Sequence, residues 1–181
     1  MKINADKLKR MMANAGATKE SLAKAIERPD LDEREAEAAV SNWLANRNHP
    51  RAKAPDIRAI AEACSCRPAD IATFETKARF VRSSARKARL MADLIRGRRV
   101  DDAMTLLEFN HRRAADMVLK ALKTAIADAE QSEADVSKLV VAESRVDGGP
   151  IIKRFQPKDR GRAFPIRKRT SHIVLGVEEA A

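Results

Sequence analysis

Basic side chains follow one another closely along a stretch of the chain that cannot form a hydrophobic core. Between Pro150 and Arg169 the single acidic residue is Asp159. The basic residues of this stretch are Lys153, Arg154, Lys158, Arg160, Arg162, Arg167, Lys168 and Arg169. On an extended chain, Lys and Arg at this spacing can each reach a phosphate, and the release of condensed counterions drives that association without reading a base sequence. The stretch therefore predicts contact with a polyanion.

Two strands are expected to carry this basic stretch, because apolar residues recur on alternate positions at both of its ends. The positions that would share a face are Val140, Ala142, Ser144 and Val146 in the first strand and Ile173, Leu175 and Val177 in the second. Between the strands, proline, aspartate and glycine are typical of a loop tip. The expected tip residues are Pro157, Lys158, Asp159, Arg160 and Gly161. The pattern predicts an extended β-hairpin at about residues 146–172.

An isolated ribbon of two such arms is marginally stable in water, so a partner must order it. Each arm would run about 18 residues, which is on the order of 60 Å. The alternative is a disordered basic loop. Large apolar residues interleaved with the charges favour the ribbon, because disordered tails are poor in such residues. These apolar residues are Ile151, Ile152, Phe155, Phe164 and Ile166. We therefore expect a ribbon that becomes ordered on nucleic acid.

The composition favours a nucleic-acid partner over other classes of partner. The formal net charge of +10 and the pI near 10.0 attract polyanions. Aromatic residues make up 3% of the chain and Tyr is absent, so base stacking is not expected as the main binding mode. No apolar run approaches the ~20 residues that cross a bilayer, and the N-terminus lacks the apolar core of a secretory signal. The chain is expected to be cytoplasmic, without membrane contact.

No set of residues predicts a catalytic or metal site. Cys64 and Cys66 are separated by one residue, which does not suit a disulfide framework, and no histidine has zinc-finger spacing toward them. His111 and Glu143 lack a nearby nucleophile or a phosphate-binding glycine loop and are better explained as surface groups. We expect no enzymatic activity, no cofactor and no metal.

The charge divides the chain into two expected domains, residues 1–75 and 76–181. Residues 1–75 hold 13 of the 36 basic residues and 12 of the 26 acidic ones, so 23 basic and 14 acidic residues lie in the remainder. Such asymmetry indicates two units with different partners. For the first domain we expect an all-α unit of four to five helices, which periodicity and capping residues place at Ala5–Ala15, after Thr18, at Glu33–Leu44 and at Ala54–Cys64.

The order of these helices is accompanied by a recurring set of residues. They are Leu8, Thr18, Leu22, Ala23, Val40, Ser41, Trp43, Asp56, Ile57, Ile60 and Ala61. With them the unit resembles the helix-turn-helix domain of Cro/C1-type phage repressors over roughly Ala5 to Phe74. The chain departs from that family before the expected recognition helix, where acidic residues would be repelled by phosphate. These acids are Glu27, Asp30, Asp32, Glu33, Glu35 and Glu37. We therefore prefer a packing or protein-docking module, with RNA as another partner and a DNA-binding regulator as the alternative function.

The second domain begins with a pattern of strand and helices. Ala78–Arg82 alternates like a short strand, and Ser84 is expected to cap a helix that runs through Arg96. Its first turns carry Arg86, Lys87 and Arg89. Positive charge there opposes the helix macrodipole, which indicates a ligand, although a solvated basic face is the alternative. Further helices are expected at Asp101–Phe109 and from Asn110 to about Glu130.

A series of motifs runs through the second domain from Lys77 to Val177. They are Ala78-Arg79-Phe80-Val81-Arg82, Ser84-x-Arg86-Lys87-Ala88-Arg89-Leu90, Asp93-Leu94-Ile95-Arg96-Gly97, Ala125-x-Ala127-x-Ala129-Glu130, Val146-Asp147-x-Gly149-Pro150-x-x-Lys153-Arg154-Phe155, Arg160-Gly161-Arg162-Ala163 and Ile166-x-Lys168-Arg169-Thr170-Ser171-His172-Ile173. Together these motifs resemble the family of universal large-subunit ribosomal protein number twenty-two. The chain departs from the family at Ala85, where a proline is common, at Gly148, where an acid is usual, and at Asp128, where an asparagine is common.

The resemblance implies an α+β fold, in which a small α/β globular domain carries the long hairpin. It implies a structural constituent of the large ribosomal subunit that supports assembly and lines the nascent-peptide exit tunnel with its hairpin. The implied partners are large-subunit ribosomal RNA, neighbouring ribosomal proteins and the nascent peptide. The residues expected to bind ribosomal RNA are Arg79, Arg82, Arg86, Lys87, Arg89, Lys153, Arg154, Lys158, Arg160, Arg162, Arg167, Lys168, Arg169 and His172.

Overall fold

The computed structural model describes residues 1–26 and 28–180, so Glu27 of the acidic segment lies outside the described residues. Internal contacts divide the chain into two compact units. The first unit comprises Met1–Phe74, Asp128–Asp135 and the residues from Glu178 onward, and the second comprises Glu75–Ala127 and Val136–Val177. Each unit is therefore assembled from segments that lie far apart in the sequence.

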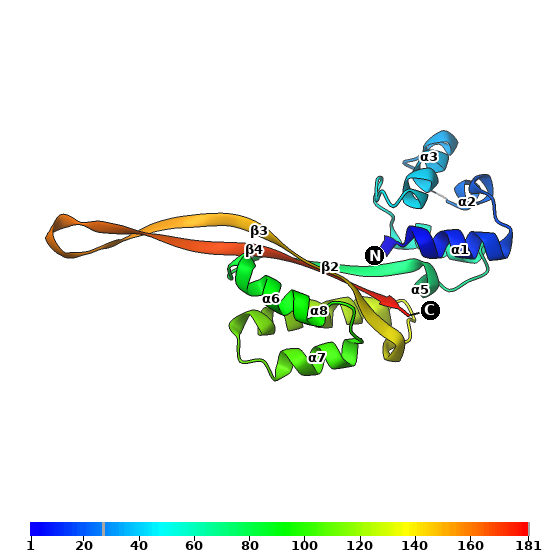
Figure 1. Cartoon of the computed structure of the whole chain (residues 1–181). Coiled ribbons are helices and arrows are strands. Elements are labelled where there is room, and N and C mark those ends of the chain that lie inside the picture. The colour runs from blue at the N-terminus through cyan, green and yellow to red at the C-terminus, as the bar shows by residue number, and fades with distance from the viewer. Residues whose placement is uncertain (27, 181) are drawn as a thin grey trace. The chain divides into compact units, whose positions relative to one another are not determined.

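The first unit consists mainly of short helices (Figure 1). In chain order its elements are β1 (Lys2–Ile3), α1 (Ala5–Ala15), α2 (Lys19–Ala25), α3 (Glu33–Leu44), α4 (Ala54–Ala63), α5 (Pro68–Ile71) and the start of β2 (Ala72–Val81). The two-residue strand β1 was not expected from the sequence, and it pairs antiparallel with β2 through Lys2 opposite Thr73 and Ile3 opposite Ala72. The three longer helices expected in this half are confirmed, with α4 ending one residue earlier than expected.

Local capping explains where the first helices begin and end. The Asn4 side chain accepts hydrogen bonds from the backbone N–H groups of Asp6 and Lys7, and α1 ends at Gly16 in the left-handed region with φ +64°. Thr18 and Ser21 form a capping box at the start of α2. Such caps satisfy the backbone groups that a helix end leaves without partners.

The first unit also buries an apolar core. Its largest fully buried side chains are Leu8, Leu22, Trp43, Ile57, Ile60, Ile71 and Phe74. The Trp43 indole N–H donates to the carbonyl of Pro50 at 2.8 Å, which gives the polar atom of this ring the partner that burial requires. Packing of this core, together with the caps, accounts for helices that are individually too short to be stable in water.

The second unit contains three helices and three long strand segments. Its elements are the remainder of β2, α6 (Ala85–Ile95), α7 (Val100–Glu108), α8 (Arg113–Glu130), the 3₁₀ turn η1 (Val136–Lys138), β3 (Leu139–Pro157), the 3₁₀ turn η2 (Asp159–Gly161) and β4 (Ala163–Glu179). The sheet order is β1-β2-β4-β3. β4 is thus an inner strand, and Ile173 through Val177 are all buried on it. This explains why that segment is apolar at consecutive positions and not only at alternate ones.

Strands β3 and β4 continue beyond the helices as a two-stranded ribbon (Figure 1). From Pro150 to Arg169 the side chains are exposed or half-buried. The turn is closed by a hydrogen bond from the Lys158 N–H to the Arg162 carbonyl at 2.7 Å. Near the globular end the two strands approach closely, because a Cβ on Gly149 would lie 2.5 Å from the Thr170 Oγ1. A glycine is therefore required where the ribbon leaves the domain.

The expected register of β3 was wrong. Val140 and Ala142 do not share the buried face of β3 with Ser144 and Val146. Instead Leu139 and Val141 are buried, so the alternation shifts by one residue before Ser144. This part of β3 also accepts and donates backbone hydrogen bonds at Val141, to Gly97 and Arg98, and these contacts with a distant loop set its register.

The helix boundaries around Asn110 and Gly97 also differ from expectation. The Asn110 side chain accepts from the Arg112 N–H at 3.1 Å, forming a turn of the Asx type, so α8 begins three residues later at Arg113. Helix α6 ends at Ile95, one residue before the expected end, because Arg96 is already extended with φ −61° and ψ 130°. Gly97 follows with φ +74° and donates its N–H to the Val141 carbonyl. β2 is also longer than the strand expected at Ala78–Arg82.

Candidate nucleic-acid interface

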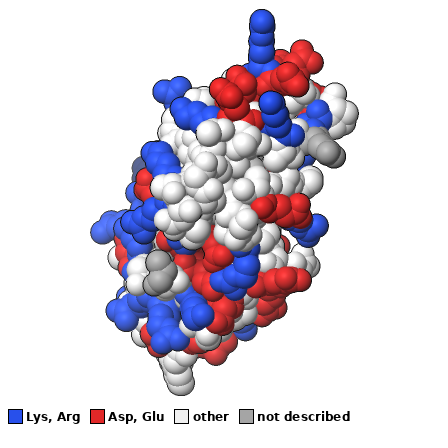
Figure 2. Space-filling view, turned by 90° about the vertical axis from the view of Figure 1, so that its right-hand side faces the viewer, with Lys and Arg blue, Asp and Glu red and all other residues white. Residues whose placement is uncertain are grey.

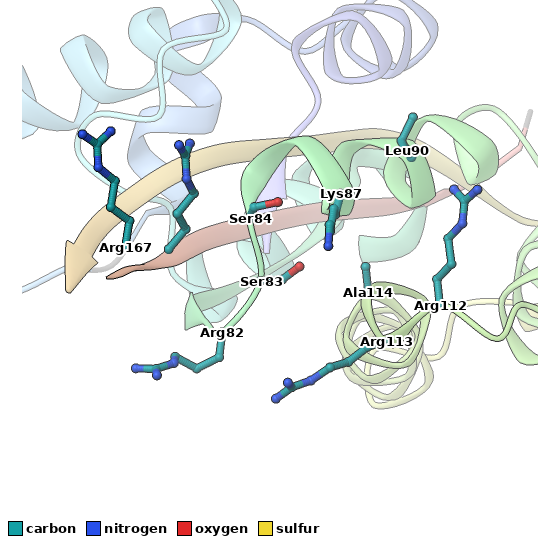
Figure 3. A pocket seen from close by; sticks show the side chains of 10 residues that line it. Arg82, Ser83, Ser84, Lys87, Leu90, Arg112, Arg113, Ala114 and Arg167 are labelled. Carbon is teal, nitrogen blue, oxygen red and sulfur yellow. The ribbon is translucent and has the colours of Figure 1, made fainter. Parts of the chain in front are cut away.

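The starts of helices α6 and α8 and the base of the ribbon surround an open hollow of roughly 730 Å³ in the second unit (Figure 3). Its lining residues are Arg82, Ser83, Ser84, Lys87, Leu90, Arg112, Arg113, Ala114, Arg167 and Arg169. Six of these ten side chains are cationic, and none of the described residues that line the hollow is acidic. We call this group of residues the basic hollow.

Helix ends add to the positive potential of the basic hollow. Ser84 is the N-cap of α6, but its side chain makes no capping hydrogen bond. The first N–H groups of a helix have no partner within the helix, and the macrodipole places partial positive charge there. Ser83 and Ser84 line the hollow at this helix start. Hydroxyls, free helix N–H groups and guanidinium groups together form the donor set that binds a phosphate.

The basic hollow brings together residues from separate parts of the sequence. Arg82 follows β2, Lys87 lies on α6, and Arg167 and Arg169 come from β4. These four belong to the expected RNA-binding set. Arg112 and Arg113 were missed, although a basic pair in the first turn of the helix expected from Asn110 opposes the macrodipole in the same way as Arg86 and Lys87 do. That signal could have identified them.

The remaining cations of the ribbon point into solvent along its length. Lys153, Arg154, Lys158, Arg160, Arg162 and Lys168 are all exposed. Within the described residues, the one ion pair at the tip joins Arg160 to Asp159 at 3.8 Å, and both side chains are about nine-tenths exposed. Such a pair contributes little stability and leaves the cations available to a polyanion.

Two residues of the expected RNA-binding set make hydrogen bonds within the protein. Arg89 donates through Nε to the Val146 carbonyl at 3.1 Å, and so ties α6 to β3. His172 accepts the Phe80 N–H on Nδ1 at 3.1 Å. A neutral imidazole that accepts at Nδ1 carries its proton on Nε2. His172 is therefore a hydrogen-bonded brace between β4 and β2, and it does not line the basic hollow with the arginines.

The first unit has a different electrostatic character. On α3 the exposed side chains include Glu33, Arg34, Glu35 and Glu37, and Figure 2 shows acidic side chains gathered at the top of the view, over α3, with a few basic ones among them. This is the helix that would read DNA in a helix-turn-helix protein. Its carboxylates would repel the phosphates of a duplex.

The groups with clearly shifted pKa values also lie in the first unit. Burial, with smaller contributions from the neighbouring Cys64 and Asp70, raises the pKa of the Cys66 thiol to about 11. Burial also raises the pKa of Cys64. Hydrogen bonds to Asp70 and Glu179 raise the pKa of Arg67 further above its already high value. Both cysteines are therefore protonated and poorly reactive at neutral pH.

The described residues contain neither a metal-binding cluster nor a membrane-spanning helix. Among residues 1–26 and 28–180, no three His, Cys, Asp or Glu side chains lie close enough together to hold a metal ion. In the same part of the chain no helix has both the length and the apolar character needed to cross a bilayer.

The chain is similar in sequence to known ribosomal proteins. The family model described as Ribosomal protein L22p/L17e matches residues 76–178. The large ribosomal subunit protein uL22 of Clostridium novyi (strain NT) is 48% identical over 105 residues, which cover 58% of this chain and 95% of the relative. The protein of the same name from Clostridium perfringens (strain 13 / Type A) shows the same identity and coverage.

The matched range contains the basic hollow, the ribbon and all fourteen residues of the expected RNA-binding set, and it leaves residues 1–75 outside. It covers more than half of the chain, and the relatives are covered almost completely. The chain therefore belongs to the L22p/L17e family of ribosomal proteins.

Proposed function

We propose that this protein is a structural constituent of the large ribosomal subunit and binds large-subunit ribosomal RNA through the basic hollow and the ribbon. The family is one of structural ribosomal proteins, in agreement with the expectation that the chain catalyses no reaction. The observation that carries the proposal is that six of the ten residues lining one hollow are cationic and none is acidic. A protein without a polyanionic partner would suffer uncompensated repulsion among these charges.

The ribbon is proposed to penetrate between RNA helices and to line the nascent-peptide exit tunnel. From Asp147 to Pro157 one arm extends for about 36 Å at ~3.3 Å per residue. Over this length it has no core of its own, and its cations are spread along both strands. Neighbouring ribosomal proteins and the nascent peptide are the further proposed partners, and the ribosome of the cytoplasm is the proposed location. Residues 76–181 form the proposed RNA-binding domain.

Paired charge removals at the start of α8 and farther along it test the proposal. In the full chain, Arg112→Gln with Arg113→Gln removes two cations from the basic hollow. Lys120→Gln with Lys123→Gln removes the same charge from ion pairs with Asp116 and Glu108 on the exposed side of the molecule. Binding to purified large-subunit ribosomal RNA is measured by filter retention over a series of salt concentrations.

We expect the Arg112 and Arg113 variant to lower the slope of log affinity against log salt by about 1.5, because each phosphate contact contributes about 0.7–0.9. The Lys120 and Lys123 variant is expected to leave the slope nearly unchanged. Equal slopes of log affinity against log salt for the two variants would show that the basic hollow does not contact the RNA. A wild-type chain that bound no ribosomal RNA at low salt would end the proposal as a whole.

We also propose that the expected first domain, residues 1–75, is a helix-turn-helix-like module used for protein docking. The support is the order of α1 to α5 and the acidic exposed face of α3. In the full chain, Glu33→Gln with Glu35→Gln and Glu37→Gln should leave RNA affinity almost unchanged and raise nonspecific binding to duplex DNA. If the wild-type chain shifted one DNA sequence selectively in a gel, and this triple variant did not, the DNA-binding alternative would replace the docking proposal.

A further inference from the structure

Phe80 has an unusual combination of backbone strain and exposure. Its φ is +56°, in the left-handed region that a bulky side chain rarely adopts. Its side chain is 59% exposed although it lies on strand β2. The aromatic ring therefore gains little from burial, and the backbone conformation is itself unfavourable. Strain of this kind persists only where the surroundings hold it, and it gathers at functional positions.

His172 is the group that holds Phe80 in this conformation. The Phe80 N–H donates to Nδ1 of His172 at 3.1 Å. The two rings also meet edge to face, with centroids 4.8 Å apart and an interplanar angle of 76°. This geometry is the favourable one for an aromatic pair. It fixes the orientation of the Phe80 ring and leaves more than half of the side chain open to solvent.

We propose that Phe80, braced by His172, is a stacking platform for one unpaired base of RNA. The proposal rests on the function proposed above and adds a second kind of contact to it. An aromatic face stacks on any base because every base has a π-face. The exposed Arg79 and Arg82 flank Phe80 in sequence and supply the phosphate contacts that a stacked nucleotide needs on its two sides. Because the ring is already oriented, stacking does not have to order it first.

The rings of the other exposed phenylalanines are not oriented in this way by a second ring in the part of the chain that the structure describes. Phe109, Phe155 and Phe164 are also more than half exposed. Among the described residues, however, Phe80 is the one aromatic side chain whose ring is fixed by a second ring. The expectation that stacking is not the main binding mode still stands, since one platform adds a single base contact to many phosphate contacts.

The test compares two charge-matched probes with the full chain. One is a 12-nucleotide single-stranded oligoadenylate, and the other is a ribose-phosphate chain of the same length without bases. Phe80→Ala is expected to weaken oligoadenylate binding by about fivefold to a hundredfold, the range of one lost stacked base, and to leave binding of the abasic chain unchanged. Phe80→Trp should retain tight binding. Phe109→Ala, the matched control at another exposed phenylalanine, should match the wild type.

NMR spectroscopy tests whether His172 positions the Phe80 ring. On addition of oligoadenylate to the wild type, the Phe80 ring resonances should shift upfield in NMR spectra, as they do when a base lies over a ring, and the abasic chain should leave them in place. In His172→Ala the shift should shrink while Phe80 remains present.

The results separate this inference from the function on which it rests. If the wild type binds ribosomal RNA with strong salt dependence but Phe80→Ala leaves the affinity for oligoadenylate unchanged, or weakens both probes equally, the stacking platform is overturned and the phosphate interface stands. If the wild type fails to bind ribosomal RNA at all, the function proposed above falls, and the platform falls with it.

Discussion

Gly148 and Gly149, at the base of the ribbon, differ in the space that a side chain would find there. A Cβ on Gly149 would lie 2.5 Å from Thr170 Oγ1 and 3.1 Å from the Thr170 carbonyl carbon, whereas a Cβ on Gly148 would meet nothing within 4 Å. Gly149→Ala must therefore separate β3 from β4 and disturb the hydrogen bond from Thr170 Oγ1 to the Pro150 carbonyl. We expect a loss of about 1–3 kcal/mol in the free energy of unfolding. Gly148→Ala should cost much less in the same denaturation experiment, and equal losses would contradict the close approach.

Cys66 allows a prediction of pH dependence at the level of one thiol. Its pKa of about 11 leaves roughly a hundredfold less thiolate at pH 8 than an ordinary cysteine has. With Cys64 retained and the two thiols distinguished by peptide mass spectrometry, alkylation of Cys66 by iodoacetamide should be slower than in the unfolded chain by about that factor. Its rate should increase until pH 11. The raised pKa stabilises the fold below about pH 8.5, and this contribution is lost as the pH rises through 11. Native and unfolded chains that react equally fast at pH 8 would refute the shift.

At the level of elements, the start of α6 predicts a stabilising substitution. Ala85 is the first residue of this helix, and Ser84 before it has φ −76° and ψ 141°. Those angles suit a residue that precedes proline, and the first helical position tolerates the missing N–H. Ala85→Pro should therefore raise the free energy of unfolding by about 0.4–1 kcal/mol. Ala92→Pro, in the buried middle of the same helix, should lower it by about 3 kcal/mol or more. Thermal denaturation of both variants distinguishes them, and a destabilised Ala85→Pro chain would be the contrary result.

The elements show which features the sequence alone can predict. Helices with a strong cap and one apolar face were predicted almost to the residue, as with α1 and α3, because the signals are local. The register of β3 was mispredicted because its backbone partners at Gly97 and Arg98 lie more than forty residues earlier in the chain. The basic hollow was predicted in part for the same reason. Its cations on β4 and α6 were visible as charge, whereas Arg112 and Arg113 became part of it only through the packing of α8.

At the level of the whole molecule, the first unit depends on residues from the far end of the sequence. Glu178 accepts from the Asn4 side chain at 2.9 Å. The buried Glu179 pairs with Arg67 at 3.0 Å. No segment of residues 1–75 supplies these two carboxylates, so the sequence boundary expected near residue 75 does not coincide with the boundary of the compact unit.

A double substitution tests this dependence. Glu178→Ala with Glu179→Ala removes both acceptors, so the Asn4 amide loses its partner and Arg67 keeps Asp70 alone. The first unit should therefore lose about 1–3 kcal/mol of stability. Hydrogen exchange should quicken in α1 and remain unchanged in α6, which belongs to the second unit. The control is Glu108→Ala with Asp116→Ala, which removes two exposed ion pairs and should have little effect. Uniform loss of protection across both units would argue against two separate bodies.

The pairing of Asn4 with Glu178 also fixes an order of events during the synthesis of this protein. The two residues are 174 positions apart, and at about 5–20 residues per second a ribosome needs roughly 9–35 s to pass from one to the other. Helix α1 is made before the basic ribbon, yet its carboxylate partner arrives only after the ribbon has been translated. The first unit is therefore completed later than the ribbon, and a chain interrupted before Glu178 carries this unit unfinished.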